Sequence, residues 1–578
     1  MSMLAAIPDM PREITCGPVS FEIDGAGLRE LRVGGHELIR GVAFLVRDRD
    51  WGTLAPEISD IEMHRAGDRL EYALTARYRS AGATLTARLR ISAGPDGLDL
   101  RAEGRAEGQF ETNRAGFTVL HPIAGQAGAP LRVTHADGRV EQTTFPDLIA
   151  PWQPVKEIAA LRNSVGPWDC DCTLSGDVFE MEDQRQWGDA SFKTYNRPLA
   201  LPWPYVLAPG VMEPQAVSLR WHRRVEPVTP RRDASRMGAR LMQTALVLTP
   251  EEALRAAQRS SDLDAVRPQR LLCSLDATLD DAAGAFAAFA ALQVAAPNYV
   301  FDLELICGFD ADPDAELVAH SATMRAVGFA PESVMVCASV DRQSTPPGSD
   351  WPDCPPLAEI HAAARAAFPK VTLGGGMASF FPELNRKRPA EDAWDFVTHG
   401  LCPIVHDARD AAVMQTLEAV GDITRSAEAI AGARGYRVGP CSIAMRQNPY
   451  GSRTIPNPGS ERVCMTDDDP RHRTDFGAAY AVGLATRLAT SRAEVWTPAA
   501  LYGPRGLFDA AGRPLPITAA LAALAGAAGQ RVISAEIEAG LARLELERVA
   551  FTANLTPGRL AGLEAHGWMK EDRGPAAC

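Results

Sequence analysis

Residues 299–327 have the sequence YVFDLELICGFDADPDAELVAHSATMRAV, and they show the pattern that decides the fold of the second half of the chain. Tyr299–Cys307 is a short and mostly apolar run, which is typical of a strand buried on both faces. Residues 313–327 follow it with helical patterning. A buried strand followed by a helix is the unit from which parallel α/β sheets and barrels are built.

The same alternation continues through residues 266–530. Further strands are expected at Leu271–Asp276, Ser333–Ser339, Lys370–Leu373, Phe396–His399 with a partner at Ile404–His406, Arg437–Met445 and Glu494–Ala499. Helical patterns lie between them, at 280–294, 357–367, 409–432, 475–490 and 515–528. Seven or eight such units predict a (β/α)₈ TIM-like barrel. A doubly wound sheet is the alternative, and it is disfavoured because no Gly-rich phosphate loop follows the first strand.

The N-terminal part of the chain shows strand patterns instead. Ala83–Ser92 alternates apolar and polar residues, the turn sequence GPDG follows, and Leu98–Glu103 returns, which predicts a hairpin. Helical periodicity is scarce before residue 250. We therefore expect an antiparallel β-sandwich in residues 1–225, a linker in 226–265, the barrel in 266–530 and a small C-terminal β-domain in 531–578.

The composition excludes several classes of protein. The 578 residues are 46% hydrophobic, as in a globular protein, and the net charge of −14 argues against nucleic acid and anionic membranes as partners. No apolar run is long enough to cross a membrane. Eleven scattered cysteines, several of them in apolar strands, favour free thiols and a cytoplasmic location. The oligomeric state stays open, with a homo-oligomer as one possibility.

Candidate site residues are sought at the carboxyl ends of the barrel strands, where TIM barrels carry their chemistry. Asp302 and Glu304 lie two residues apart on one face of an apolar strand, where carboxylates are costly unless they are paired or hydrated. Glu304 is a candidate catalytic base and Asp302 a substrate ligand. The alternative is that each is bridged to an arginine of a neighbouring strand.

Two later segments add polar residues. Asn385 and Arg386 follow the Gly374–Gly376 stretch in a charged loop, and Arg446 and Asn448 follow the strand expected at Arg437–Met445. Amide and guanidinium groups of this kind bind polyols and carboxylates. Helix capping or turn formation is the alternative for Asn448.

The fifth unit contains two histidines. His406 is a candidate general base, with Asp407 beside it, and His399 is a candidate substrate ligand. The structural alternatives are a core histidine for His399 and an N-cap of the next helix for Asp407.

Several catalytic motifs are missing from the sequence. There is no G-x-S-x-G, H-E-x-x-H, Walker A or G-x-G-x-x-G sequence, so a serine α/β-hydrolase, a zincin, an NTPase and a dinucleotide enzyme are not supported. We expect no cofactor, and a metal is not excluded.

A charged and aromatic stretch, Phe179–Tyr205, stands out from the strand patterns around it. It has no helical separation of polar and apolar residues, and mixed charge among aromatics is typical of a small-molecule site. We expect Glu182 to be catalytic and Asp183, Arg185 and Lys193 to bind substrate, with these side chains facing the barrel. The alternative is a charge network that locks one domain to another.

Five segments together resemble the bacterial D-apionate lactonases. They are MEDQRQWGDASFKTYNRPLALPWPY (Met181–Tyr205), FPDLIAPWQPVKEIAALR (Phe145–Arg162), RAGFTVLHPIAG (Arg114–Gly125), FPELNRKRP (Phe381–Pro389) and CPIVHDARDAAVMQTLEAV (Cys402–Val420). The resemblance implies an N-terminal β-domain, a barrel and a small C-terminal β-domain. It also implies hydrolysis of D-apionolactone to D-apionate.

Two other functions stay open at this point. A glycoside hydrolase would need two carboxyl groups, for which Glu304 and Glu383 are the available pair. A sugar-binding protein without catalysis would need neither. For a lactonase, Glu304 or His406 is the expected base, Arg446, Arg185 or Lys193 the oxyanion donor, and Asn385 a ligand of hydroxyls.

Overall fold

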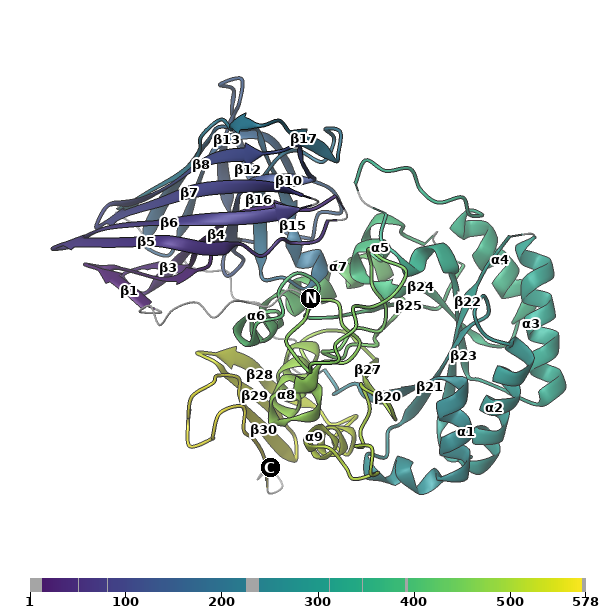
Figure 1. Cartoon of the computed structure of the whole chain (residues 1–578). Coiled ribbons are helices and arrows are strands. Elements are labelled where there is room, and N and C mark those ends of the chain that lie inside the picture. The colour runs from purple at the N-terminus through teal and green to yellow at the C-terminus, as the bar shows by residue number, and fades with distance from the viewer. Residues whose placement is uncertain are drawn as a thin grey trace. The chain divides into compact units, whose positions relative to one another are not determined.

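The computed structural model describes residues 13–49, 51–80, 82–224, 239–310, 312–345, 347–389 and 393–573. The chain forms two compact units. The first contains residues 1–184 and 190–232, and the second contains residues 185–189 and 233–578 (Figure 1). The short segment 185–189 therefore belongs to the second unit, although its neighbours on both sides in the sequence belong to the first.

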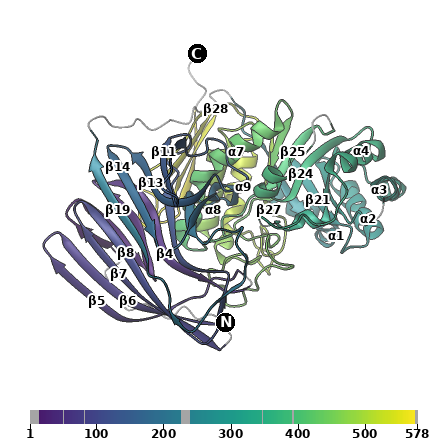
Figure 2. The same cartoon turned by 90° about the horizontal axis from the view of Figure 1, so that it is seen from above.

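The first unit is antiparallel and rich in strands, as the sequence predicted. Among its described residues, seventeen strands join one hydrogen-bonded order and two form a separate pair. Strands β5 to β8 run side by side in Figure 2. The strands are β1 (Glu13–Cys16), β2 (Val19–Asp24), β3 (Gly27–Val33), β4 (His36–Arg47), β5 (Glu57–Ala66), β6 (Arg69–Ser80), β7 (Ala83–Gly94), β8 (Gly97–Glu107), β9 (Phe110–Thr112), β10 (Arg114–Pro122), β11 (Pro130–His135), β12 (Val140–Thr144), β13 (Val155–Val165), β14 (Trp168–Ser175), β15 (Phe179–Asp183), β16 (Ser191–Asn196), β17 (Tyr205–Leu207), β18 (Gly210–Val211) and β19 (Gln215–Arg223).

The predicted hairpin is confirmed. Strands β7 and β8 pair along their whole length up to Gly94 and Gly97, which flank the turn. Side chains alternate between the two faces of each strand, and one face carries the core. Phe44, Phe117 and Tyr78 meet in that core, where the Tyr78 hydroxyl donates to the Phe44 carbonyl at 2.9 Å.

The second unit contains a closed barrel of eight parallel strands, which confirms the predicted fold class for the described part of this unit. The strands are β20 (Gln243–Leu248), β21 (Arg270–Asp276), β22 (Val300–Cys307), β23 (Ser333–Ala338), β24 (Thr372–Phe380), β25 (Phe396–Gly400), β26 (Gly435–Val438) and β27 (Val495–Ala500). Ile404–His406 is not a strand, so that expectation was wrong. The predicted strand Arg437–Met445 ends at Val438, and its remainder is loop.

The expected linker is also corrected. Residues 226–238 lie outside the described part of the chain, and residues 243–265 belong to the barrel. Strand β20 pairs in parallel with both β21 and β27, and so closes the ring. The helix that follows it begins with a capping box in which Thr249 and Glu252 bind each other's backbone N–H groups.

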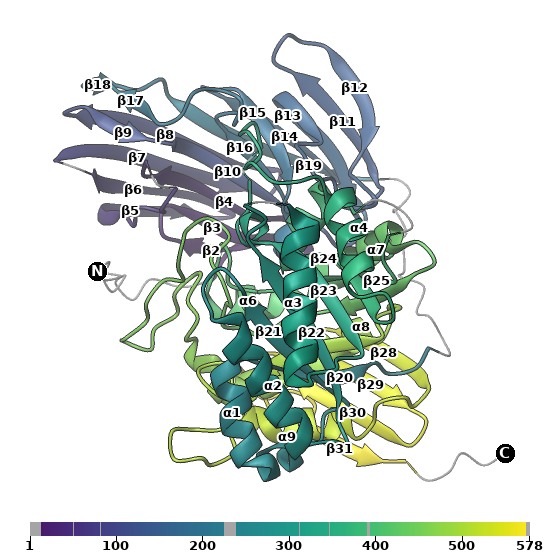
Figure 3. The same ribbon diagram turned by 90° about the vertical axis from the view of Figure 1, so that its right-hand side faces the viewer.

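Most of the helices fall close to their predicted positions, but Phe381–Arg386, which contains Asn385 and Arg386 and was expected to be a charged loop, is also helical. Helices α1 to α4 flank the barrel strands in Figure 3. The α-helices are α1 (Pro250–Gln258), α2 (Ala282–Ala295), α3 (Pro313–Val327), α4 (Leu357–Ala367), α5 (Phe381–Arg386), α6 (Asp410–Gln415), α7 (Leu417–Ala431), α8 (Asp475–Leu488) and α9 (Pro516–Ala525). Short 3₁₀ turns are η1 (Gln184–Trp187), η2 (Ser260–Ala265), η3 (Ser339–Arg342) and η4 (Pro470–Arg473). No helix in the described residues is long and apolar enough to cross a membrane.

The C-terminal strands form a small antiparallel sheet that contacts α8 of the same unit. They are β28 (Val532–Glu538), β29 (Leu541–Leu546), β30 (Val549–Asn554) and β31 (Trp568–Asp572). A side chain at Gly483 of α8 would meet Leu417 and Leu555, so this glycine allows the close packing.

A buried ionic network closes the beginning of the barrel. Asp302 of β22 accepts two hydrogen bonds of 2.7 Å from Arg270, one of 3.2 Å from Arg437 and one of 2.5 Å from Ser333. Burial alone would raise the pKa of Asp302, but these partners outweigh it and hold the pKa below its ordinary value. The Asp302 carboxylate is therefore bound by Arg270, Arg437 and Ser333.

We predict that Asp302→Asn lowers the free energy of unfolding by about 3–5 kcal/mol, because it leaves the Arg270 and Arg437 charges buried without a carboxylate. The measurement is urea unfolding at pH 7. Since the folded pKa is depressed, this stability is present at neutral pH and is lost as the pH falls through the folded value. A loss below about 1 kcal/mol would contradict the prediction.

Candidate active site

A long loop after β26, residues 439–469, connects the elements that surround the end of the barrel. It contains no helix or strand. Its hydrogen bonds reach strands β22 and β24 and the segments that follow β23 and β25. Arg446 contacts Glu304 of β22 and the Ala378 carbonyl of β24. Gln447 donates to the Arg342 carbonyl at 2.9 Å, and the Pro449 carbonyl accepts from Ser344 N–H at 2.7 Å. Tyr450 contacts His406.

Glu304 and Arg446 form the centre of this arrangement. Glu304 is only 2% exposed, and its carboxylate accepts from Ser274 Oγ at 2.8 Å and pairs with the Arg446 guanidinium. The alternative role considered for Glu304, a bridge to an arginine, is therefore present in the structure. Because Arg446 also donates to the Ala378 carbonyl, this pair ties the loop to two barrel strands.

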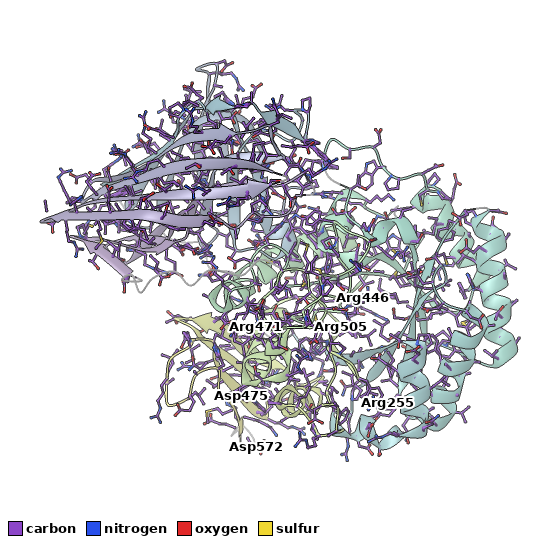
Figure 4. The ribbon with its side chains drawn as sticks, viewed as in Figure 1. Arg255, Arg446, Arg471, Asp475, Arg505 and Asp572 are labelled. Carbon is purple, nitrogen blue, oxygen red and sulfur yellow. The ribbon has the colours of Figure 1, made fainter. Side chains whose placement is uncertain are left out.

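A second guanidinium, that of Arg505, lies beside Arg446 (Figure 4). Burial and the positive charge of Arg446 lower the pKa of Arg505, whereas Glu252 and Asp467 raise it. Arg505 Nη1 donates to the Met445 carbonyl at 2.8 Å. Within the described residues, no carboxylate comes within 4 Å of the Arg505 guanidinium. The ion-paired Arg446, in the loop after β26, and Arg505, in the turn after β27, are therefore neighbouring cations.

His406 is held between a carboxylate and a phenol. Its Nδ1 lies 2.7 Å from Asp189 Oδ2, and its Nε2 lies 3.3 Å from the Tyr450 hydroxyl. The His406 side chain is 15% exposed, and the Trp187 ring packs edge-on against it at 5.8 Å. A carboxylate only accepts hydrogen bonds, so Nδ1 carries the proton in the neutral ring and the lone pair is on Nε2, on the side of the Tyr450 hydroxyl.

Asp189 reaches His406 because residues 185–189 belong to the second unit. Arg185 is fully buried and pairs with Asp422 of α7 at 2.7 Å. Gly188 has a φ of +92°, a conformation that favours glycine. A Cβ atom at this position would lie 3.4 Å from the Cys402 carbonyl oxygen. Arg185 therefore anchors on α7 the segment that presents Asp189 and Trp187.

Other predicted residues of the stretch belong to the first unit. Glu182 pairs with Lys193 at 2.5 Å, and both strands that carry them pair with each other. Asp183 is fully buried and accepts from Ala150 N–H at 3.0 Å.

The residues predicted near the fourth strand have clear local partners. Arg386 of α5 donates to Ser344 Oγ at 3.0 Å and to the Thr345 carbonyl at 3.1 Å, and its guanidinium lies 5.9 Å from the Trp187 ring centre. Asn385 is buried and its Oδ1 accepts from Arg388 at 3.0 Å. Arg386 is thus placed beside Trp187, which contacts His406.

His399, the other histidine of the fifth unit, has a different environment from His406. His399 is fully buried, donates from Nδ1 to the Gly400 carbonyl at 3.0 Å and accepts from the Tyr436 hydroxyl at 2.9 Å. Burial lowers the pKa of His399 to about 4, so it is a neutral core residue. These contacts agree with the alternative given for His399 in the sequence analysis, a core histidine.

Asp407 and Asn448 organise turns. Asp407 Oδ1 accepts from Arg409 N–H at 3.0 Å, and Arg409, not Asp407, is the N-cap of α6. Asn448 Oδ1 accepts from the N–H groups of Tyr450 and Gly451, at 2.9 and 3.2 Å. Asn448 therefore positions Tyr450 in the structure.

Sequence reasoning missed Asp189, Trp187, Tyr450 and Arg505 as site residues. Asp189 and Trp187 lie in the stretch that was singled out, but nothing local distinguishes them from the other charges and aromatics there. Tyr450 directly follows the predicted Arg446–Asn448 segment. Arg505 lies beyond the last strand, in a turn where an exposed arginine is ordinary.

One group in the described residues could hold a metal ion. Cys307, Glu316 and His320 have ligand atoms within 4.8 Å of one another. The Glu316 oxygens already accept from the Gly308 and Phe309 N–H groups, at 3.1 and 2.8 Å. Burial raises the pKa of the Cys307 thiol, which keeps it protonated. Glu316 therefore binds the backbone of the turn between β22 and α3, whereas the N-cap of α3 is Asp312.

A concave region of about 940 Å³ opens at the opposite end of the barrel, where the strands begin. Its lining includes Arg240, Arg270, Glu332, Arg437 and Arg492. TIM barrels carry their chemistry at the other end, where the loops that hold His406 and Arg446 lie.

Comparison with known proteins agrees with the two-unit architecture. Residues 3–224 match the N-terminal domain model of D-apionate lactonase, and residues 244–529 match its TIM barrel domain model. The D-apionate lactonase of Brucella anthropi is 41% identical over 539 residues, which cover 90% of this chain and 88% of that protein. The chain belongs to the D-apionate lactonase family. The family resemblance of the sequence segments is thereby confirmed.

Solved structures are only distantly similar. A rhamnosyl-glucuronidase of Fusarium oxysporum is 10% identical, with a TM-score of 0.38 over 57% of this chain and 80% of that one. A GH30 endoxylanase of Clostridium papyrosolvens is 8% identical, with a TM-score of 0.36 over 59% of this chain and 95% of that one. Scores this low carry no argument about function.

We predict that Arg185→Gln lowers the free energy of unfolding of the second unit by about 3 kcal/mol or more, because Asp422 loses a fully buried partner. The matched control is Arg425→Gln, which removes a partly exposed partner of the same Asp422. Such a pair contributes about 1 kcal/mol or less. Urea unfolding measures both variants, and equal losses would contradict the assignment of Arg185 as the anchor.

Proposed function

We propose that this protein hydrolyses a sugar lactone, D-apionolactone, to D-apionate in the catabolism of D-apiose. Membership of the D-apionate lactonase family supports the reaction class, and the name of the Brucella anthropi relative supports the substrate. The Asp189–His406 pair is the observation in the structure that carries the mechanism, since ester hydrolysis by water needs a positioned base.

His406 is the proposed general base. With Nδ1–H held by Asp189, the lone pair of Nε2 takes a proton from a water molecule whose oxygen attacks the lactone carbonyl carbon. A tetrahedral oxyanion forms. When it collapses, the bond from carbon to the ring oxygen breaks, and the imidazolium returns the proton to that oxygen. The products are a hydroxyl group and a carboxylic acid, which loses its proton to solvent.

Arg446 and Arg505 are the proposed donors to the oxyanion. Donors in fixed positions stabilise the charge that develops in the transition state, and one such donor contributes about 100- to 1,000-fold in rate. Glu304 pairs with Arg446 and fixes its direction, so Glu304 acts here as a positioning residue and not as the base. Arg505, which has no carboxylate within ion-pair distance in the described residues, supplies a charge that is not already neutralised.

Arg386, Tyr450 and Trp187 complete the proposed site. Tyr450 contacts His406, and Trp187 packs against Tyr450 and lies beside Arg386. Their hydrogen-bond donors suit the hydroxyl groups of a small sugar, and their rings suit its carbon edge. Asn448 supports Tyr450 from behind. A further part of the proposal is a cytoplasmic location, which the free thiols of the described cysteines support. The glycoside hydrolase alternative, based on Glu304 and Glu383, stays a prediction.

We predict that His406→Asn lowers kcat for D-apionolactone about 100- to 10,000-fold, because the proton acceptor is lost. Asp189→Asn is expected to act in the same direction, since the amide no longer selects the Nδ1–H tautomer. Ring opening is followed with a pH indicator. His399→Asn changes a core histidine and is the control, which should alter stability more than kcat in the folded fraction.

Combining His406→Asn and Asp189→Asn should cost little more than His406→Asn alone, because the two residues act as one unit. Additive losses would contradict this assignment. If the wild type opens neither D-apionolactone nor related aldonolactones, the proposed function fails.

We predict that Arg505→Met lowers kcat about 100- to 1,000-fold with a smaller change in KM, since the charge is needed mainly in the transition state. Arg513→Met, an exposed arginine in the following turn, is the control and should retain wild-type rates. A change in KM alone would show that Arg505 binds the ground state and is not an oxyanion donor.

A further inference from the structure

The first unit carries a polar face that the proposed reaction does not use. Strand pairing places Thr118, Tyr195 and Glu180 in one row across β10, β16 and β15, and Leu120, Lys193 and Glu182 in the next. Directly paired residues lie on the same face of a sheet, as do residues two or four apart along a strand. Arg114 therefore shares this face with Thr118.

Arg114 is the unusual residue of this face. It is only 6% exposed, and its guanidinium carbon lies 3.9 Å from the Tyr195 ring centre and 5.5 Å from that of Trp51. In the described part of the chain, its side chain makes no hydrogen bond and no ion pair, and its Nε is buried without an acceptor. Buried charges are normally paired, because the loss of hydration is costly.

The neighbouring charged groups are engaged with each other. Lys193 pairs with Glu182 at 2.5 Å, and the Tyr195 hydroxyl donates to Glu180 at 2.7 Å. Glu180 also accepts from Leu199 N–H at 2.8 Å. The two carboxylates lower the electrostatic cost of the Arg114 charge from a distance but do not bind it. Thr118 Oγ1, on the same face, is also buried without a partner in the described residues.

Aromatic rings border this cation. Trp51 and Trp203 pack edge to face at 5.3 Å, and Trp203 is 36% exposed. Arg197 lies over the Tyr205 ring at 4.5 Å. Small-molecule sites combine apolar rings of this kind with a few placed polar groups, and a cation without an anion is the group that a carboxylate would complete.

We propose that the face around Arg114, in the first unit, binds a small sugar acid. The carboxylate lies against the Arg114 guanidinium, the hydroxyl groups meet Thr118, Glu182 and Lys193, and a carbon edge rests on Trp51. A neutral sugar fits less well because it leaves the Arg114 charge uncompensated. The choice of D-apionate as the sugar acid to test rests on the proposed function, whereas the site itself does not.

The test is calorimetric titration of the full chain with D-apionate and, as a matched ligand, with the corresponding polyol that has an alcohol in place of the carboxylate. The wild type is compared with Arg114→Gln, Arg114→Lys, and Arg505→Met in the barrel unit. Arg220→Gln, an exposed and ion-paired arginine of the first unit, is the control. Thermal unfolding of each variant shows whether it is folded.

We expect Arg114→Gln to weaken one D-apionate binding event about 10- to 100-fold, the effect of losing a charged hydrogen bond. Arg114→Lys keeps the charge but not the paired donors, and should lie between Arg114→Gln and the wild type. The polyol should bind at least tenfold more weakly than D-apionate. Arg505→Met should leave this event in place, and Arg220→Gln should not change it.

Unchanged D-apionate binding in folded Arg114→Gln would overturn the proposal, as would equal binding of acid and polyol. If Arg114→Gln and Arg505→Met abolish the same single event, the separate site is also overturned. These outcomes are independent of the ring-opening assay on the wild type, so failure of the lactonase proposal and failure of this site are distinguishable.

Discussion

The ion pair between Arg446 and Glu304 is the interaction on which the proposed active site depends. Residues 439–469 contain no helix or strand, and ordering a loop of that kind costs conformational entropy at every residue. Arg446 offsets part of this cost by binding β22 and β24 at once. Asn448 then folds the next turn, and Tyr450 meets His406. Removing the pair would therefore disturb donors and base together.

A second constraint comes from five residues that leave one unit and join the other. The segment 185–189 contains the carboxylate that orients His406 and the Trp187 ring beside it, yet it lies between two strands of the first unit in the sequence. The buried Arg185–Asp422 pair fixes this segment on α7. Removing one partner of a buried pair is far more costly than removing an exposed one, so the position of Asp189 is defined by a strong interaction outside the site.

Much of the barrel could be predicted from sequence, because strands buried on both faces are apolar runs and the helices between them have clear boundaries. The first strand, β20, was missed since its short run follows a charged segment and resembles the end of the preceding domain. The site was harder. Asp302 and Glu304 share a strand face, but only the fold shows that Asp302 meets Arg270 at the beginning of the barrel. His399 and His406 likewise cannot be told apart locally in the sequence, but His399 is buried against Tyr436, whereas His406 meets Asp189, 217 residues away.

The arginines of this protein suggest a physical criterion that local sequence does not contain. Arg185, Arg270 and Arg446 are each bound to a carboxylate, and their contacts hold elements together. Arg505 and Arg114 have no carboxylate within ion-pair distance among the described residues, although both are largely removed from water. Burying such a charge without a partner is unfavourable for the free protein. A negative charge recovers that free energy when it is supplied by a transition state at Arg505 or by a bound sugar acid at Arg114. The two cations without a carboxylate partner are therefore stronger candidates for function than the ion-paired arginines.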